Sequence, residues 1–125
     1  MAKYIRTKEG NIYQRFFKDK SIRGVGGSGC CDKKLNPIGE TIIKQADTIE
    51  ELCDGFWWEN KMYDEPIFIP NYQLALDRFN SWKQSDKALN SNCLANITIY
   101  GSIYIKGKGW FHVAKMNSNG ELELL

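Results

Sequence analysis

The chain has 125 residues, of which 42% are hydrophobic and 26% charged, and its net charge is +2. This composition is typical of a folded domain with its own core and argues against intrinsic disorder. No apolar run approaches the length of a membrane span, and the N-terminus lacks the apolar segment of a signal peptide. We therefore expect no membrane partner and a cytoplasmic location.

The charge is unevenly distributed along the chain. Residues 1–36 carry nine basic and three acidic residues, whereas residues 37–81 carry three basic and nine acidic residues. The two segments have net charges of +6 and −6. They either present opposite faces to a charged partner or attract each other in the fold, and both interpretations stay open.

The N-terminal segment predicts a β-hairpin and a basic, glycine-rich loop. Lys3–Thr7 and Asn11–Phe17 read as two strands around a turn with Gly10. The residues expected to be buried are Tyr4, Ile12, Phe16 and Phe17. Residues 18–29 include the pattern GVGGSG, but no helix start follows it, so a mobile loop is expected rather than a dinucleotide site.

The central segment predicts a short strand at 41–43 and then a helix. Asp47 and Glu50 have the spacing of a capping box. The apolar face of this helix would consist of Ile49, Leu52, Cys53 and Phe56, with Gly55 interrupting it near its end. Trp57 and Trp58 follow, and adjacent residues of an extended segment cannot both point inward, so at least one should lie at the surface or in an interface.

A second helix is predicted from Tyr72 to about Gln84, with Asn71 as its cap, after an extended segment at 62–70 whose prolines suit a sheet edge. Its apolar stripe consists of Tyr72, Ala75, Leu76, Phe79 and Trp82. The C-terminal third predicts a β-meander with strands at 94–105, 110–116 and 121–125. The first of these would place its isoleucines on one face, opposite Thr98, Tyr100, Ser102 and Tyr104.

The expected fold class is α+β. An antiparallel sheet would combine the N-terminal hairpin with the C-terminal meander, and two helices would pack on one face. The chain reads as a single domain, 1–125, with a basic part at 1–45 and the helices and meander at 46–125. An alternative is that the first 45 residues form a small barrel of their own.

No catalytic motif is present, so we expect a protein that is not an enzyme. His112 stands alone in a predicted strand, which is more typical of a structural histidine. The four cysteines include no CxxC pair, and without a secretion signal they should be reduced thiols. No metal and no cofactor are expected.

Three segments resemble a family of small proteins encoded by phages and prophages of Gram-positive bacteria. They are MAKYIRTKEGNIY, IIKQADTIEELCDGF and IYGSIYIKGKGWFHVAKMNSNGELELL. Because small accessory phage proteins are often antagonists of bacterial immunity, the resemblance implies a binding protein that blocks a host defence component in the bacterial cytoplasm. The most concrete form of this hypothesis is an anti-CRISPR protein acting on a nucleic-acid-binding effector. Its expected partner-binding residues are Trp57, Trp58, Glu50, Glu51, Asp54, Glu59, Asp64 and Glu65.

Two other functions remain open. One is a sponge, possible as a homo-oligomer, that sequesters a cyclic nucleotide or an ADP-ribose-derived signal. Its anion-binding residues would be Arg15, Lys18, Lys20 and Arg23. The other is a small nucleic-acid-binding regulator that uses residues 1–36, although the acidic middle segment argues against it.

Overall fold

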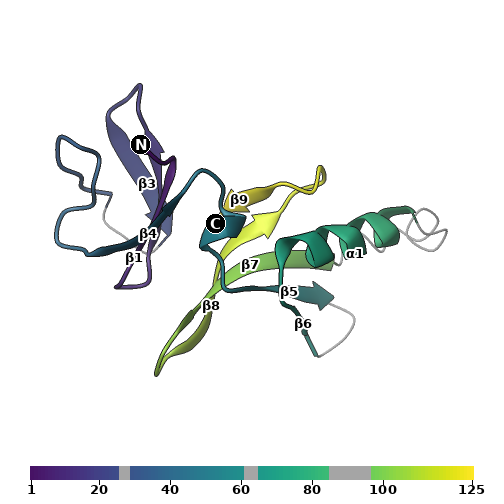
Figure 1. The fold of residues 1–125 in the computed structure, drawn as a ribbon. Coiled ribbons are helices and arrows are strands. Elements are labelled where there is room, and N and C mark those ends of the chain that lie inside the picture. Colours follow the sequence, from purple (N-terminus) through teal and green to yellow (C-terminus); the bar gives the residue numbers. More distant parts are fainter. Residues whose placement is uncertain (26–28, 61–64, 85–96) are drawn as a thin grey trace. The chain divides into compact units, whose positions relative to one another are not determined.

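The computed structural model describes residues 1–25, 29–60, 65–84 and 97–125. It divides into two compact units, the first at Met1–Leu52 with Leu124–Leu125 and the second at Cys53–Glu123. The elements are β1 (Tyr4–Thr7), β2 (Ile12–Phe16), β3 (Ser21–Val25), β4 (Ile42–Ala46), the 3₁₀ helix η1 (Glu50–Leu52), β5 (Gly55–Asn60), β6 (Ile67–Ile69), α1 (Tyr72–Gln84), β7 (Ile97–Ile105), β8 (Gly109–Met116) and β9 (Leu122–Leu124). Figure 1 shows these elements, in which antiparallel strands dominate, so the mixed α+β class is confirmed.

The first unit contains a four-stranded antiparallel sheet in the order β3-β2-β1-β4. The predicted hairpin is present, and Gly10 takes a left-handed backbone with φ of 92° at its turn. Burial of Ile12 is confirmed, whereas Phe17 lies in the turn after β2 and is 48% exposed. The apolar cluster of this unit consists of Ile5, Tyr13, Ile22 and Leu35.

The glycine-rich segment begins as a strand, not as a mobile loop. β3 pairs with β2 along its whole length, and Gly24 lies opposite Tyr13. A Cβ atom at Gly24 would lie 2.1 Å from the carbonyl oxygen of Ile12, so glycine here permits close backbone approach. Residues 26–28, the centre of the predicted loop, lie outside the described residues.

The prediction of a helix that begins at Asp47 is wrong. A single 3₁₀ turn, η1, replaces it, and strand β5 begins at Gly55. One half of a capping box forms at the next pair of residues along the chain, since Glu51 accepts hydrogen bonds from the amide and hydroxyl of Thr48. Strand formation prevails because residues 55–60 pair with two neighbouring strands, which a helix of this length cannot match by local bonds.

The second unit contains a five-stranded antiparallel sheet in the order β6-β5-β7-β8-β9. The C-terminal meander is present as predicted, and Ile99 and Ile103 of β7 are fully buried. The prediction of one continuous sheet is wrong, because β5 occupies the free edge of β7 and β4 occupies that of β1. The expected edge segment is β6, between Pro66 and Pro70.

Helix α1 is the only α-helix among the described residues, so the prediction of two helices on one face is also wrong. The predicted cap is present, since the amide of Leu74 donates to Asn71 Oδ1 at 2.9 Å. The predicted stripe packs on the sheet, with Ala75 fully buried against a cluster that includes Phe56 and Trp58. In the part of the chain that the structure describes, no helix has the length and apolarity to cross a membrane.

Candidate functional site

An aromatic surface covers the face of the second sheet that lies opposite α1. Phe56 and Trp58 of β5 point toward the helix and its core, so the intervening Trp57 points to the other face. There it contacts Phe68 of β6 and Trp110 of β8, and Trp110 in turn contacts Tyr104 of β7. We call this surface the aromatic face, and it consists of Trp57, Phe68, Tyr104 and Trp110.

The four rings of the aromatic face form one contiguous cluster, in which Trp110 contacts each of the other three. The ring centroid of Trp57 lies 5.2 Å from that of Phe68 and 5.7 Å from that of Trp110. Trp110 lies 5.3 Å from Phe68 and 5.4 Å from Tyr104. These are distances of favourable aromatic packing, so the rings support one another as a preformed surface.

Gly55 makes room for this arrangement at the start of β5. A Cβ atom there would lie 2.3 Å from the ring of Phe68 and 3.1 Å from that of Trp110. The two rings therefore lie directly over the glycine backbone. The sequence suggests a helix breaker at this position, whereas its role in the structure is steric.

The aromatic face is open to solvent at its outer members. Phe68, Tyr104 and Trp110 are 44%, 49% and 38% exposed. The indole Nε1 of Trp57 is buried and finds no acceptor among the described residues. Contacting aromatic side chains of this exposure are typical of binding surfaces rather than of a closed core.

A polar row continues the same sheet face on β5, β7 and β8. His112 Nδ1 lies 2.6 Å from Ser102 Oγ, and its Nε2 lies 3.4 Å from a carboxylate oxygen of Glu59. The ring of Tyr100 stacks on that of His112, with centroids 4.2 Å apart. The predicted solitary histidine therefore has partners that only the strand register brings together.

The Ser102–His112–Glu59 row has the residue types of a hydrolase triad but lacks an accessible nucleophile. Ser102 is fully buried, so its hydroxyl cannot meet a substrate carbonyl without local opening of the sheet. The hydroxyl and the carboxylate instead fix the orientation of the imidazole. The three side chains thus hold one another in place on the sheet face that also carries the aromatic rings.

Charged groups of both signs border the aromatic face. Asp54 accepts the backbone amide of Tyr104 at 2.7 Å, and Glu59 follows Trp57 by two residues on the same strand face. Lys106 and Lys108 occupy the turn between β7 and β8, next to Tyr104 and Trp110 in sequence. The border is therefore mixed rather than uniformly basic or acidic.

The two adjacent tryptophans point in opposite directions. Trp57 belongs to the aromatic face, whereas Trp58 is 8% exposed and packs in the core below α1. The guanidinium of Arg78 lies over the Trp58 ring, 5.2 Å from the ring centre. Trp58 is thus a core residue and cannot anchor a partner in this conformation.

The predicted acidic residues do not form one group within a unit. Glu50 and Glu51 belong to η1 of the first unit, whereas Asp54, Glu59 and Glu65 belong to the second. Glu51 is engaged by Thr48. Asp64 lies outside the described residues.

The predicted basic residues differ in availability. Arg15 is 2% exposed, and its guanidinium donates to the carbonyls of Leu35 and Ala2 and to the side chains of Gln45 and Asn36. Burial lowers its pKa, and the charge of Asp32 partly opposes this effect. Arg15 is therefore a buried structural clamp, and four of the N–H groups of its guanidinium are engaged within the first unit.

The other three basic residues of that group are exposed. Arg23 lies over the ring of Phe16 at 5.1 Å, and Lys20 lines a pocket of the first unit. Lys18 lies in the turn before Lys20 and does not line that pocket. The expected anion-binding group therefore separates into residues with different surroundings.

The excess of aromatic residues is evident from the sequence, but which of these residues contact one another is not. Phe68, Tyr104 and Trp110 are missing from the predicted contact residues. The alternation of Tyr100, Ser102 and Tyr104 indicated one shared face of a strand, and this signal could have pointed to Tyr104. The meeting of β5, β6 and β8 depends on strand order, which the local pattern does not contain.

The described residues contain no group of three or more metal-ligating side chains. No family model, no curated protein and no solved structure matches this chain.

Proposed function

We propose that this protein is a phage-encoded binding protein that antagonises a bacterial defence system, and that the aromatic face is its contact surface. The preferred target is a nucleic-acid-binding effector of a CRISPR system. The observation that carries the proposal is the set of four contacting rings, three of them more than a third exposed. The resemblance of three sequence segments to phage and prophage proteins supports the origin.

The chemistry of the surface favours a protein partner. Tryptophan and tyrosine are frequent anchors of protein interfaces because they bury much area with few rotatable bonds. The mixed border of Asp54, Glu59, Lys106 and Lys108 can pair with side chains of either sign. An unbroken nucleic-acid backbone would instead require a border of one sign.

The test is an inhibition assay with purified CRISPR effector complexes of several types. We expect the protein to block target binding or cleavage by one of them at a stoichiometric ratio. Trp110→Ala and Phe68→Ala should each weaken inhibition about tenfold or more, the usual effect of losing an interface anchor.

Phe111→Ala is the matched control, because Phe111 is similarly exposed and adjacent to Trp110 but points to the opposite sheet face. It should leave inhibition within about twofold of the wild type. If no effector is affected, or if Phe111→Ala weakens inhibition as much as Trp110→Ala, the proposal is wrong.

A further inference from the structure

The first unit carries an open pocket of about 720 Å³, and all the residues that line it belong to that unit. It lies between the turn after β2 and the segment at 31–35. The residues that line it are Met1, Phe17, Lys20, Cys31, Asp32, Lys33, Lys34 and Leu35. Its volume falls in the range of small-molecule sites.

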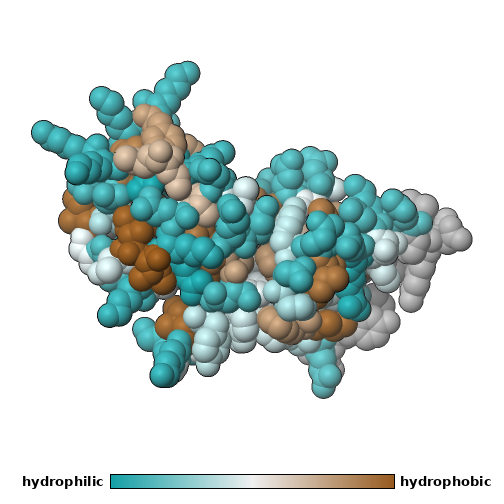
Figure 2. Space-filling view, viewed as in Figure 1, coloured by the Kyte–Doolittle hydropathy of each residue, from teal (hydrophilic) through white to brown (hydrophobic). Residues whose placement is uncertain are grey.

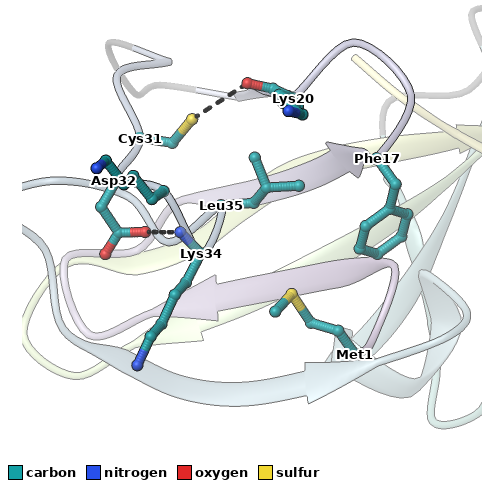
Figure 3. Close-up of a pocket in the computed structure, with 8 residues that line it drawn as sticks. Met1, Phe17, Lys20, Cys31, Asp32, Lys34 and Leu35 are labelled. Carbon is teal, nitrogen blue, oxygen red and sulfur yellow. Dashed lines mark hydrogen bonds between the residues drawn. The ribbon is translucent and has the colours of Figure 1, made fainter.

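The pocket combines an apolar part with a cationic part. Figure 3 shows Leu35 near the centre of the view, with Phe17 and Met1 to one side and Asp32 and Lys34 to the other. Met1 is 75% exposed and Phe17 48%. In the part of Figure 2 that corresponds to β1–β4, brown hydrophobic groups likewise interrupt the hydrophilic surface.

The charge of the lining is positive. Lys20, Lys33 and Lys34 provide three ammonium groups, and Asp32 is the single carboxylate of the lining. One oxygen of that carboxylate already accepts the backbone amides of Lys34 and Asn36 at 2.8 and 3.0 Å. The net formal charge of about +2 is opposite in sign to that of a phosphate monoester and can balance it, and lysine is a common phosphate ligand.

Backbone and side-chain hydrogen bonds hold the segment at 31–35, which forms one wall of the pocket. Cys31 and Pro37 form an isolated antiparallel bridge, and Leu35 donates its amide to the carbonyl of Asp32. Arg15 of β2 donates to the carbonyl of Leu35 and to the side chain of Asn36. The wall is therefore preorganised by a buried clamp, which reduces the entropy cost of binding.

Backbone strain coincides with the same pocket. Two described residues other than glycine have positive φ, namely Lys20 at 53° and Leu35 at 61°. Both line the pocket. Left-handed backbone in residues with long side chains is unfavourable, and such residues are found preferentially at ligand sites.

We propose that this pocket binds a small organic phosphate whose apolar group rests on Met1, Phe17 and Leu35 while its phosphate contacts Lys20, Lys33 and Lys34. A nucleotide is the first candidate, since its base can lie against the Phe17 ring. A short alkyl phosphate shares the same chemistry. The site goes beyond the proposed antagonist function, because it uses other residues in the other unit.

The experiment is calorimetric titration of the full chain with five probes. They are a nucleoside monophosphate, a cyclic dinucleotide, octyl phosphate, inorganic phosphate and a nucleoside without phosphate. At least one of the three organic phosphates should bind at least about tenfold more tightly than the last two probes, since each of these lacks one half of the interactions. The organic phosphate that binds most tightly shows whether the ligand is a nucleotide or an alkyl phosphate.

Matched lysine variants locate the site. Lys34→Glu should weaken the best probe about tenfold or more, whereas Lys18→Glu introduces the same charge change outside the pocket and should stay within about threefold. Phe17→Ala should weaken organic phosphates but leave inorganic phosphate unchanged. Equal losses from Lys34→Glu and Lys18→Glu, or no organic phosphate binding below about 1 mM, overturn the proposal. Neither result bears on inhibition through the aromatic face.

Discussion

Tyr13 donates its phenolic hydrogen to the carboxylate of Glu40, which joins β2 to the segment that leads into β4. The same carboxylate accepts hydrogen bonds from Asn11 Nδ2 at 2.5 Å and from Thr7 Oγ1 at 2.9 Å. Burial by itself raises the pKa of Glu40, but these three donors outweigh it and hold the pKa below its ordinary value of 4.5. Burial and the neighbouring carboxylate raise the pKa of Tyr13 well above its usual range.

This network predicts acid-sensitive stability of the first unit. Because the folded-state pKa of Glu40 is lowered, its stabilising contribution is complete above the ordinary pKa and is lost as the pH falls through the folded-state value. Glu40→Gln should reduce the free energy of unfolding by about 1–3 kcal/mol at neutral pH and flatten the acid limb. Urea unfolding between about pH 7 and pH 3 measures both effects.

Asp19→Asn is the control, because Asp19 is an exposed carboxylate in a turn of the same unit. It should change the free energy of unfolding by less than about 0.5 kcal/mol. A Glu40→Gln variant whose acid limb stays as steep as that of the wild type would contradict the assignment.

We predict that loss of the buried Arg15 guanidinium strongly lowers the free energy of unfolding. Arg15→Met leaves the buried carbonyl of Leu35 and the partly buried side-chain oxygen of Asn36 without their donor, so we expect a loss of about 2–4 kcal/mol in the free energy of unfolding. Arg23→Met, which removes an exposed guanidinium near Phe16, should cost less than about 1 kcal/mol. Chemical unfolding of the two variants gives the comparison, and equal costs would rule out the clamp.

Gly55 predicts a packing effect on the aromatic face. Gly55→Ala forces the rings of Phe68 and Trp110 to move, since the added methyl group would overlap the first of them. We expect a loss of about 1–3 kcal/mol in stability and a shift in tryptophan fluorescence. Gly101→Ala faces Cys53 on the other side of the sheet and should destabilise without that spectral shift. Unchanged fluorescence in Gly55→Ala would show that the rings do not depend on the glycine.

We predict that Ser102 does not react as a nucleophile in the folded protein. Because the hydroxyl is fully buried beside His112, a fluorophosphonate probe for serine hydrolases should not label the folded protein. Intact-mass spectrometry after incubation measures the modification. Stoichiometric labelling that Ser102→Ala abolishes would show that the row is an active triad.

Local patterns predicted the elements whose signals are local. The cap at Asn71, the stripe of α1, the hairpin at Gly10 and the meander turns depend on residues a few positions apart, and they are present as predicted. The prediction of a helix around Gly55 failed. Its helical spacing was outweighed by strand pairing with β6 and β7, which are distant in sequence.

The same distinction applies to the candidate sites. The opposite directions of Trp57 and Trp58 follow from strand alternation, so the sequence could identify a surface tryptophan but not its neighbours. Arg15 illustrates the opposite case. The basic composition of its segment suggested that Arg15 is exposed and contacts an anion. In the structure its guanidinium is buried and donates to acceptors from three separate segments of the first unit.

The left-handed backbone of Lys20 and Leu35 has a consequence for protein engineering. Glycine is the residue that tolerates this geometry, so Lys20→Gly would relieve local strain and be selected in a screen for thermostability alone. The same exchange would delete an ammonium group of the pocket. Improvement of stability and retention of ligand affinity should therefore conflict at position 20, and a variant library sorted for both properties would keep lysine there.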